Sequence, residues 1–219
     1  MTGGLRKFAL TAHVSLAVGW IGAVAAYLVL VVAAMTTKGT HTLRAAWIAM
    51  ELIGWYLIVP LALASLLTGL VMALGTPWGL FRHYWTIISL ILTVIATAVL
   101  LQHMQTVSTF ASVAADGSVD VGGLRGALPG ELLHAGVGLL ILLVINALNV
   151  YKPMGMTAYG SRRASEAAWR SRSPHVDRSE PSRGSVAVTP FWVRVLGFHA
   201  LGFAVLFVIM HLVGRGGLH

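Results

Sequence analysis

Residues 9–34 read ALTAHVSLAVGWIGAVAAYLVLVVAA, a run without a single charged side chain. A helix needs about 20 consecutive apolar residues to cross about 30 Å of hydrocarbon. The run is too long for the apolar part of a signal peptide, which has roughly 7–15 residues. Four similar runs follow, at about 47–74, 84–104, 131–151 and 191–213. The sequence therefore predicts an all-α, polytopic membrane bundle of five transmembrane helices.

The composition supports the membrane class and narrows the chemistry. The chain has 219 residues, of which 57% are hydrophobic and 10% are charged, whereas soluble proteins carry about 25% charged residues. Its net charge of +8 would suggest nucleic acid in a soluble protein, but here most of the excess lies in one loop, and we expect no nucleic-acid partner. The absence of cysteine excludes disulfides, iron–sulfur clusters and thiolate metal sites.

The basic residues predict an orientation. With five spans, the N-terminal tail and the loops at 75–83 and 152–190 share one side of the membrane, and this side collects eleven of the 15 Lys and Arg residues. Because cytoplasmic loops are enriched in Lys and Arg, we expect a plasma-membrane protein with a cytoplasmic N-terminus and an outer C-terminus. Trp47 and Trp192 lie near predicted span ends, where tryptophan anchors helices at the interface.

Residues 161–190 separate the first four spans, within residues 1–160, from the last helix and outer tail, 191–219. The segment is rich in Arg and Ser, contains Pro174 and Pro181 and lacks hydrophobic periodicity. Because it buries too little apolar surface to offset its ordering entropy, we expect a disordered basic cytoplasmic loop. Its basic residues would contribute about 1 kcal/mol each at an anionic lipid surface. The alternative is a linker that only sets the topology.

Ionisable side chains inside a membrane are costly and mark ligand, proton or cofactor sites. Six histidines lie in or beside the predicted spans, in one group near each face, and one acidic residue lies well inside a span. The inner group is His13, His83 and His199; the outer group is His103, His134 and His211, with Glu51 at a similar depth and Glu131 at the start of the fourth span.

Helical phase ranks these residues. It aligns His13 with Trp20, Val24 and Tyr27; Glu51 with Trp55, Ile58, Ala62, Ser65 and Gly69; His134 with Gly138, Ile141 and Ile145; and His199 with Gly202, Phe203, Leu206 and Met210. We therefore expect His13, His199 and His134 to bind a cofactor from bundle-facing stripes. His103, His211 and Glu51 are the candidate metal ligands.

Three interpretations of the histidines remain open. Imidazoles from different helices could hold b-type haem; the outer His and Glu residues could bind copper or zinc; or the histidines could be purely structural. Transport of copper or a small solute, and an accessory role without a cofactor, are further functional alternatives. The enzyme motifs GxSxG, HExxH and the P-loop are absent, and the sequence leaves open both a homo-oligomer and a redox partner.

Three stretches resemble a known family: AHVSLAVGWIG at 12–22, IVPLALASLLTGL at 58–70 and LGTPWGLFRHYW at 74–85. Together they resemble an actinobacterial integral-membrane family that is catalogued as a domain of unknown function, over about residues 8–105. The opening His followed by Trp-x-Gly is also similar to the copper-resistance type D membrane domain and, more faintly, to haem-associated membrane protoporphyrinogen oxidases. These likenesses imply that His13 is a metal or haem ligand. The closer family has Lys where this chain has Ser89, which puts shared chemistry in doubt.

Overall fold

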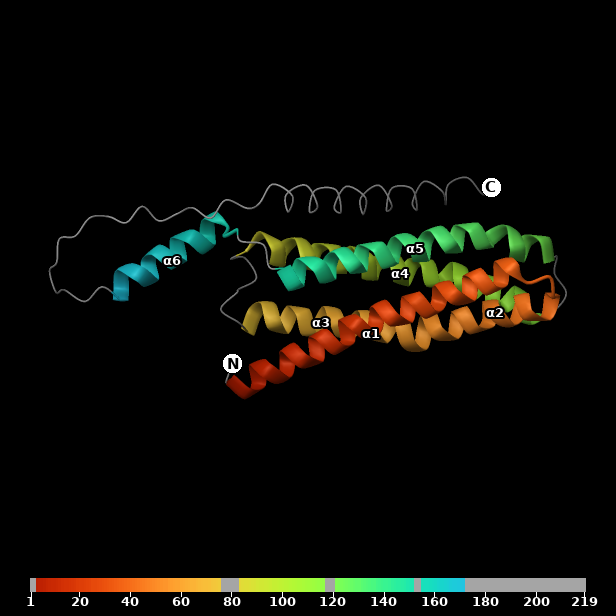
Figure 1. Ribbon diagram of the computed structural model, residues 1–219, viewed down its shortest axis with the longest axis horizontal. Helices are drawn as coiled ribbons and strands as arrows, with labels where there is room; N and C mark the ends of the chain where they lie inside the picture. Colours follow the sequence, from red (N-terminus) through yellow and green to blue (C-terminus); the bar gives the residue numbers. More distant parts are fainter. Residues whose placement is uncertain (1–2, 76–82, 117–120, 152–154, 172–219) are drawn as a thin grey trace.

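The computed structural model describes residues 3–75, 83–116, 121–151 and 155–171, and this part of the chain is helical apart from short connections (Figure 1). Two of the helices are joined without a break by a π-helical turn, η1. The elements are α1 (Gly3–Thr36), α2 (Thr40–Ile53), η1 (Gly54–Ile58), α3 (Val59–Gly75), α4 (Tyr84–Asp116), α5 (Val121–Tyr151) and α6 (Ala158–Ser171).

Four of these helices are long and apolar enough to cross a membrane: α1, the continuous helix Thr40–Gly75, α4 and α5. An all-α membrane protein is therefore supported, and the first four predicted spans correspond to these helices. The predicted fifth span at 191–213 lies outside the described residues, together with His199, His211 and Trp192. The number of five spans, the orientation and the plasma-membrane location stay predictions.

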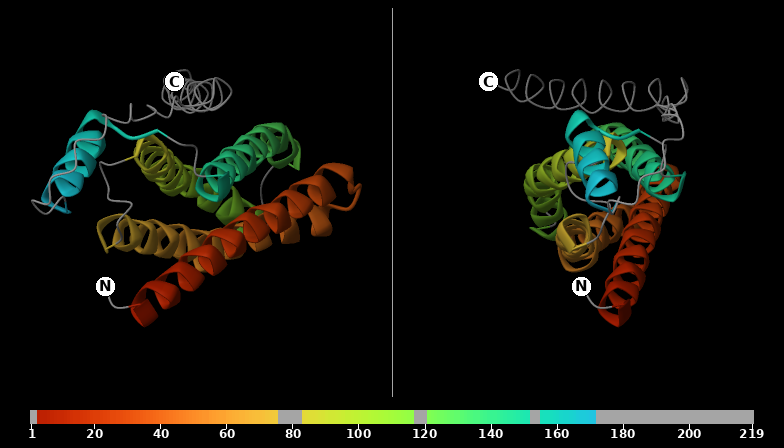
Figure 2. Two further views of the ribbon diagram at one scale, coloured as in Figure 1. Left: turned by 60° about the vertical axis from the view of Figure 1, so that its left-hand side comes forward. Right: turned by 90° about the vertical axis from the view of Figure 1, so that its left-hand side faces the viewer.

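The four helices form two layers (Figures 1 and 2). One layer contains α1 and the continuous α2–η1–α3 helix, and the other contains α4 and α5. Both α1 and α4 pack against α2, α3 and α5, so α1 and α4 stand at opposite corners of the bundle. Side chains from all four helices therefore meet along its central axis.

Both helices of the second layer are longer than the sequence suggested. The third and fourth spans were predicted at 84–104 and 131–151, but α4 continues to Asp116 and α5 begins at Val121. Regular apolar spacing explains the extension, because buried side chains recur every three or four residues on the facing sides of both helices. These residues are Val107, Ala111 and Ala114 in α4, and Leu124 and Leu128 in α5.

Trp47 belongs to this extended end of the bundle and is not an interfacial anchor. Its side chain is fully buried, its indole Nε1–H donates a hydrogen bond of 3.3 Å to the carbonyl oxygen of Leu124, and its ring stacks on Phe110. A buried indole needs a partner for its N–H, and the extended α5 supplies one. The prediction that Trp47 anchors a helix at the membrane interface was wrong. It ended the third span at 104 and began the fourth at 131, and so missed the helical residues Phe110 and Leu124 that cover Trp47.

The turn η1 changes which face of the second span is buried. In η1 the N–H of Val59 bonds to the carbonyl oxygen of Gly54, five residues earlier, so the helix gains one residue in this turn. Pro60 follows directly and has no N–H to donate, which disturbs the regular α-helical bonds of the preceding turn. Ile58 on the predicted stripe is buried, but before the turn Met50 is buried in place of Glu51, which is only half-buried.

The short helix α6 extends beyond the end of the bundle where α1 begins (Figure 1). Thr157 caps it, because its Oγ1 accepts a hydrogen bond from the N–H of Gly160 at 3.1 Å and its carbonyl oxygen accepts one from the N–H of Ser161. Residues 161–171 are thus helical, where we expected disordered chain. The remainder of the 161–190 segment lies outside the described residues.

Candidate functional site

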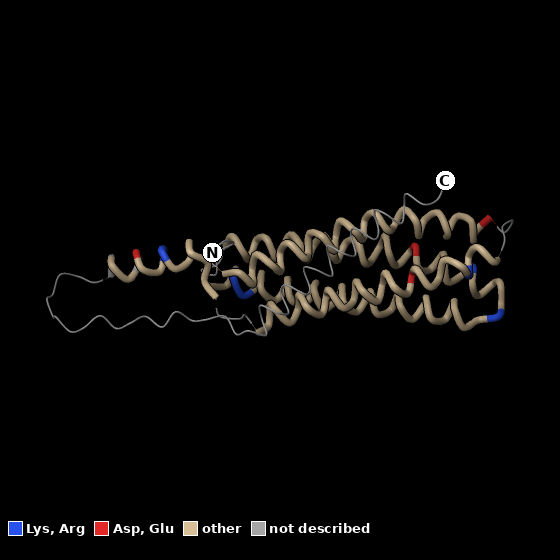
Figure 3. The backbone as a smooth tube through the Cα atoms, turned by 90° about the horizontal axis from the view of Figure 1, so that it is seen from above, with Lys and Arg blue, Asp and Glu red and all other residues tan. Residues whose placement is uncertain are grey.

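Four polar side chains from three helices meet inside the bundle, and we call them the His–Glu cluster: Tyr27 of α1, His103 of α4, and Glu131 and His134 of α5. Glu131 and His134 share one face of α5 because residues three apart lie one above the other. At 1.5 Å rise per residue, Glu131 lies about 15 Å along the helix from the start of α5. Lys and Arg of the bundle lie towards its two ends, whereas acidic residues are also found further inside (Figure 3).

One carboxylate oxygen connects the cluster. The Tyr27 hydroxyl donates a hydrogen bond of 2.7 Å to Glu131 Oε2, and His103 Nε2 lies 2.9 Å from the same oxygen. Glu131 is 3% exposed, His103 7% and Tyr27 5%. The role of His103 Nε2 as donor or acceptor depends on its tautomer; as an N–H it would give this oxygen a second donor beside Tyr27, and both bonds would then be charge-assisted if the carboxyl group is a carboxylate.

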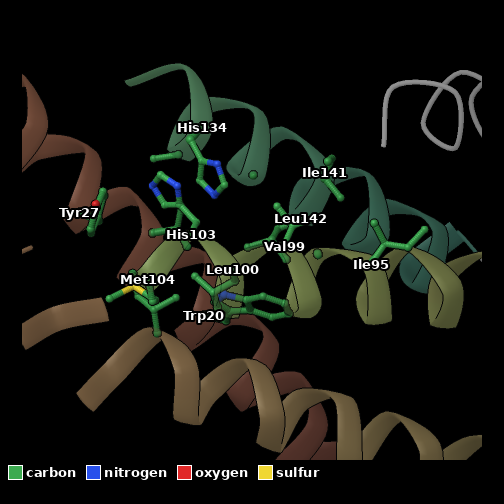
Figure 4. A pocket seen from close by; sticks show the side chains of 15 residues that line it. Trp20, Tyr27, Ile95, Val99, Leu100, His103, Met104, His134, Ile141 and Leu142 are labelled. Atoms are coloured by element: carbon green, nitrogen blue, oxygen red, sulfur yellow. The ribbon is translucent and has the colours of Figure 1, made fainter. Parts of the chain in front are cut away.

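The second histidine lies flat against the first. The rings of His103 and His134 have centroids 3.5 Å apart and planes inclined by 11°, as the close-up shows (Figure 4). Ring nitrogens direct their lone pairs within the ring plane, so two parallel rings cannot both point at one metal ion at about 2.0–2.1 Å. Accordingly, within the described residues no three His, Asp or Glu side chains are arranged to hold a metal ion.

A cavity of about 70 Å³ adjoins the two rings. Its walls are mainly apolar and come from α1, η1, α4 and α5, with Trp20, Tyr27, Met104 and both histidines among them (Figure 4). Ligand pockets for drug-sized molecules measure about 300–1,000 Å³, so a macrocycle such as haem does not fit this cavity. The bundle-facing stripes predicted for Trp20, Val24 and Tyr27, and for His134, Gly138 and Ile141, are confirmed, because all six residues line it.

His13 lies apart from this cluster, on α1 against α3. Its Nδ1 lies 3.0 Å from Thr68 Oγ1, and the Thr68 hydroxyl donates its own proton to the carbonyl oxygen of Ala64 at 2.7 Å. A hydroxyl has one proton, so if Thr68 donates it to Ala64, Nδ1 of His13 is the donor in this contact and Nε2 carries the lone pair in the neutral ring. Gly69 allows this close packing, because a Cβ there would lie 3.1 Å from Cε1 of the His13 ring.

The remaining predicted residues do not join these sites in the described part of the chain. The Glu51 carboxylate is half-buried on α2 and makes no hydrogen bond or ion pair with another described residue. His83 forms a β-bridge with Met156 near the start of α4. His199 and His211 lie outside the described residues.

No match emerges from comparison with known protein families, with curated proteins or with solved structures. Function must therefore be argued from the geometry. The resemblance to the actinobacterial membrane family and to the copper-resistance domain stays a prediction.

The sequence pointed to His134 and His103 but passed over their central partner. Glu131 was placed at the entrance of the fourth span because α5 was expected to begin there, whereas it lies well within the helix. The spacing of Glu131 and His134 was the available signal, since three residues place both side chains on one helical face. Tyr27 carried no signal of its own beyond lying on a bundle-facing stripe.

Proposed function

We propose that this helical membrane protein binds and releases a proton at the His–Glu cluster and couples that proton to the movement of a small solute. The observation that carries the proposal is the buried Glu131 carboxyl group, which accepts a hydrogen bond from the Tyr27 hydroxyl and lies beside His103 within a bundle of apolar helices. Chains of His and acidic residues inside membrane helices are typical of proton relays in pumps and transporters.

Charge arithmetic supports a capacity of one proton. With Glu131 ionised and both imidazoles neutral, the cluster carries one net negative charge in a medium of low dielectric constant, where charge is disfavoured. Uptake of one proton makes the cluster neutral overall. A second proton would leave a net positive charge, which the low dielectric constant also disfavours. If both of these protons were on the rings, two positive charges would lie 3.5 Å apart, and like charges at about 4 Å repel by about 4 kcal/mol at an effective dielectric constant of 20.

Infrared spectroscopy and proton flux test the proposal. In lipid nanodiscs, acidification should change the carboxyl and imidazole bands of the wild-type protein, and Glu131→Gln should abolish the change in these bands. In proteoliposomes with a trapped pH indicator, proton flux should fall to the level of protein-free liposomes in the same variant. Glu51→Gln is the matched control, because Glu51 makes no contact with the histidines, and it should behave like wild type. Normal bands and flux in Glu131→Gln would refute the proposal.

A second candidate function is binding of haem or a copper ion by His13, with His199 as a partner. It is supported by the surroundings of His13, because a ligating imidazole commonly donates its other N–H to a neighbouring oxygen, and Nδ1 lies 3.0 Å from Thr68 Oγ1. Bound haem or copper would supply one-electron chemistry. Purified protein should then show a Soret band or contain copper, and His13→Ala should lose it while His41→Ala, in an exposed position at the other end, should not. Colourless, metal-free protein after supplemented expression would exclude both cofactors.

We propose anionic lipids as partners of the basic segment that begins in α6. The guanidinium of Arg163 lies over the ring of Tyr159, 5.6 Å from its centroid, and Nε donates to the Tyr159 hydroxyl at 3.2 Å. Arg162 and Trp169 of the same helix are also exposed. An exposed helix that combines Arg with aromatic side chains suits a headgroup region.

A further inference from the structure

The cavity beside the histidine rings has two chemically different ends. His103 and His134 form one end, together with Tyr27, whereas the remainder of the lining is apolar side chains and one glycine, Gly138. A water molecule needs two to four polar partners, and apolar cavities stay dry and instead take up apolar guests. The apolar end is therefore suited to a guest that does not require hydrogen bonds.

The cavity reaches the surface of the bundle between α4 and α5. Some lining residues of these two helices are partly exposed, namely Ile95, Ala96 and Leu100 of α4 and His134 and Gly138 of α5, whereas those of α1 are buried. Both helices are apolar enough to cross a membrane, so among the described residues this side of the bundle would be open to the hydrocarbon phase. A guest would enter laterally from the hydrocarbon phase.

We infer that this cavity is a binding site for a small apolar solute dissolved in the membrane. A volume of about 70 Å³ is roughly half that of an engineered cavity of about 150 Å³ that binds benzene or xenon. The guest is accordingly a molecule of about two to four non-hydrogen atoms, such as dioxygen or a short hydrocarbon. The inference rests on the proposed function in one respect: it names the class of solute whose binding would be coupled to the proton at the adjoining rings.

Xenon is the probe for the site. Methyl-labelled protein in nanodiscs should show saturable chemical-shift changes under xenon pressure at Ile95 and Ile141, which line the cavity, and only weak linear changes at Leu143, which is exposed on α5. Shifts that stay linear at all three side chains would overturn the inference, because they would reflect xenon dissolved in lipid.

Two glycines of α5 supply a matched pair of variants. A Cβ at Gly138 or at Gly136 would meet no atom within 4 Å, but only Gly138 lines the cavity. Gly138→Leu should therefore fill the cavity and remove the saturable shifts, whereas Gly136→Leu should retain them. Saturable shifts that persist unchanged in folded Gly138→Leu would refute the site. If that variant does not fold, Gly138→Ala should still weaken xenon binding.

Proton binding and solute binding fail in different ways. Glu131→Gln should retain the xenon shifts, because it leaves the apolar lining intact, even though it removes the infrared response to acid. Xenon should also shift the imidazole nitrogen signals of His103 and His134 in wild type. If xenon binds but the imidazole signals do not change, the cavity is not coupled to the proton site. If xenon does not bind but the response to acid is normal, the cavity is refuted and the proton site is not.

Discussion

The hydrogen bond from Tyr27 to Glu131 offers the sharpest test of the cluster. Tyr27→Phe removes only the hydroxyl from a buried ring, so it creates no cavity in the apolar core. Hydrogen bonds to charged groups contribute about 1.5–3 kcal/mol to stability, but bonds between membrane helices average about 0.6 and reach about 1.7 kcal/mol. Because the acceptor is a buried carboxyl oxygen at 2.7 Å, and a carboxylate there would make the bond charge-assisted, we expect Tyr27→Phe to lower the free energy of unfolding by about 1–2 kcal/mol.

Reversible unfolding in mixed detergent micelles measures this change. Tyr56→Phe is the control, because Tyr56 is 79% exposed and loss of its hydroxyl should have no measurable effect. Charge-assisted bonds are roughly twice as strong as neutral ones, so the cost of Tyr27→Phe should halve in a Glu131→Gln background. If Tyr27→Phe lowers the free energy of unfolding equally in both backgrounds, the bond is not charge-assisted. If it lowers this free energy no more than Tyr56→Phe does, the hydrogen bond does not stabilise the protein.

Two further changes test the packing and the lipid contact. Gly54→Ala should be about 1 kcal/mol less stable than Gly22→Ala, since the end of the buried Met104 side chain must shift to admit the new Cβ. Gly22→Ala is the control, because its Cβ meets open space, and equal stability of both variants would refute the close contact at η1. The chain lacks cysteine, so a spin label on Glu166→Cys can report on α6: it should approach the headgroups in nanodiscs with anionic lipid, and should lose this contact when Arg162 and Arg163 are replaced by Gln. Contact that is independent of anionic lipid would argue against electrostatic binding.

Helical periodicity predicted the parts of the site that lie within unbroken helices. Trp20 and Tyr27 of α1, and His134 and Gly138 of α5, face the interior as their spacing of three and four residues requires. The same argument failed for Glu51, because the π-helical turn inserts one residue between it and the stripe that follows. A single sequence shows Pro60 but not where the extra residue is accommodated, so the phase before the turn could not be assigned.

Hydrophobic periodicity does not predict which residues of different helices contact one another. Nothing in the spacing along α4 and α5 specifies that His103 lies against His134, because the relative height of two helices depends on their packing and on the length of their connection. The sequence placed the loop between them at 105–130, and this error moved Glu131 to the membrane surface. Once the helices extend to Asp116 and from Val121, all three side chains lie at one level.

Energetics argue that the cluster is not present for stability alone. An ionised carboxylate costs about 2.5–3.5 kcal/mol at the centre of a membrane helix, and bonds between such helices average about 0.6 kcal/mol. At the value of about 1–2 kcal/mol expected above for a bond to a carboxylate, the two hydrogen bonds of Glu131 would offset about 2–4 kcal/mol, which roughly equals the cost and leaves little net stabilisation. An apolar residue of similar size would pack here without either contribution. A buried carboxylate that adds little net stability is consistent with the proposed role in taking up and releasing a proton.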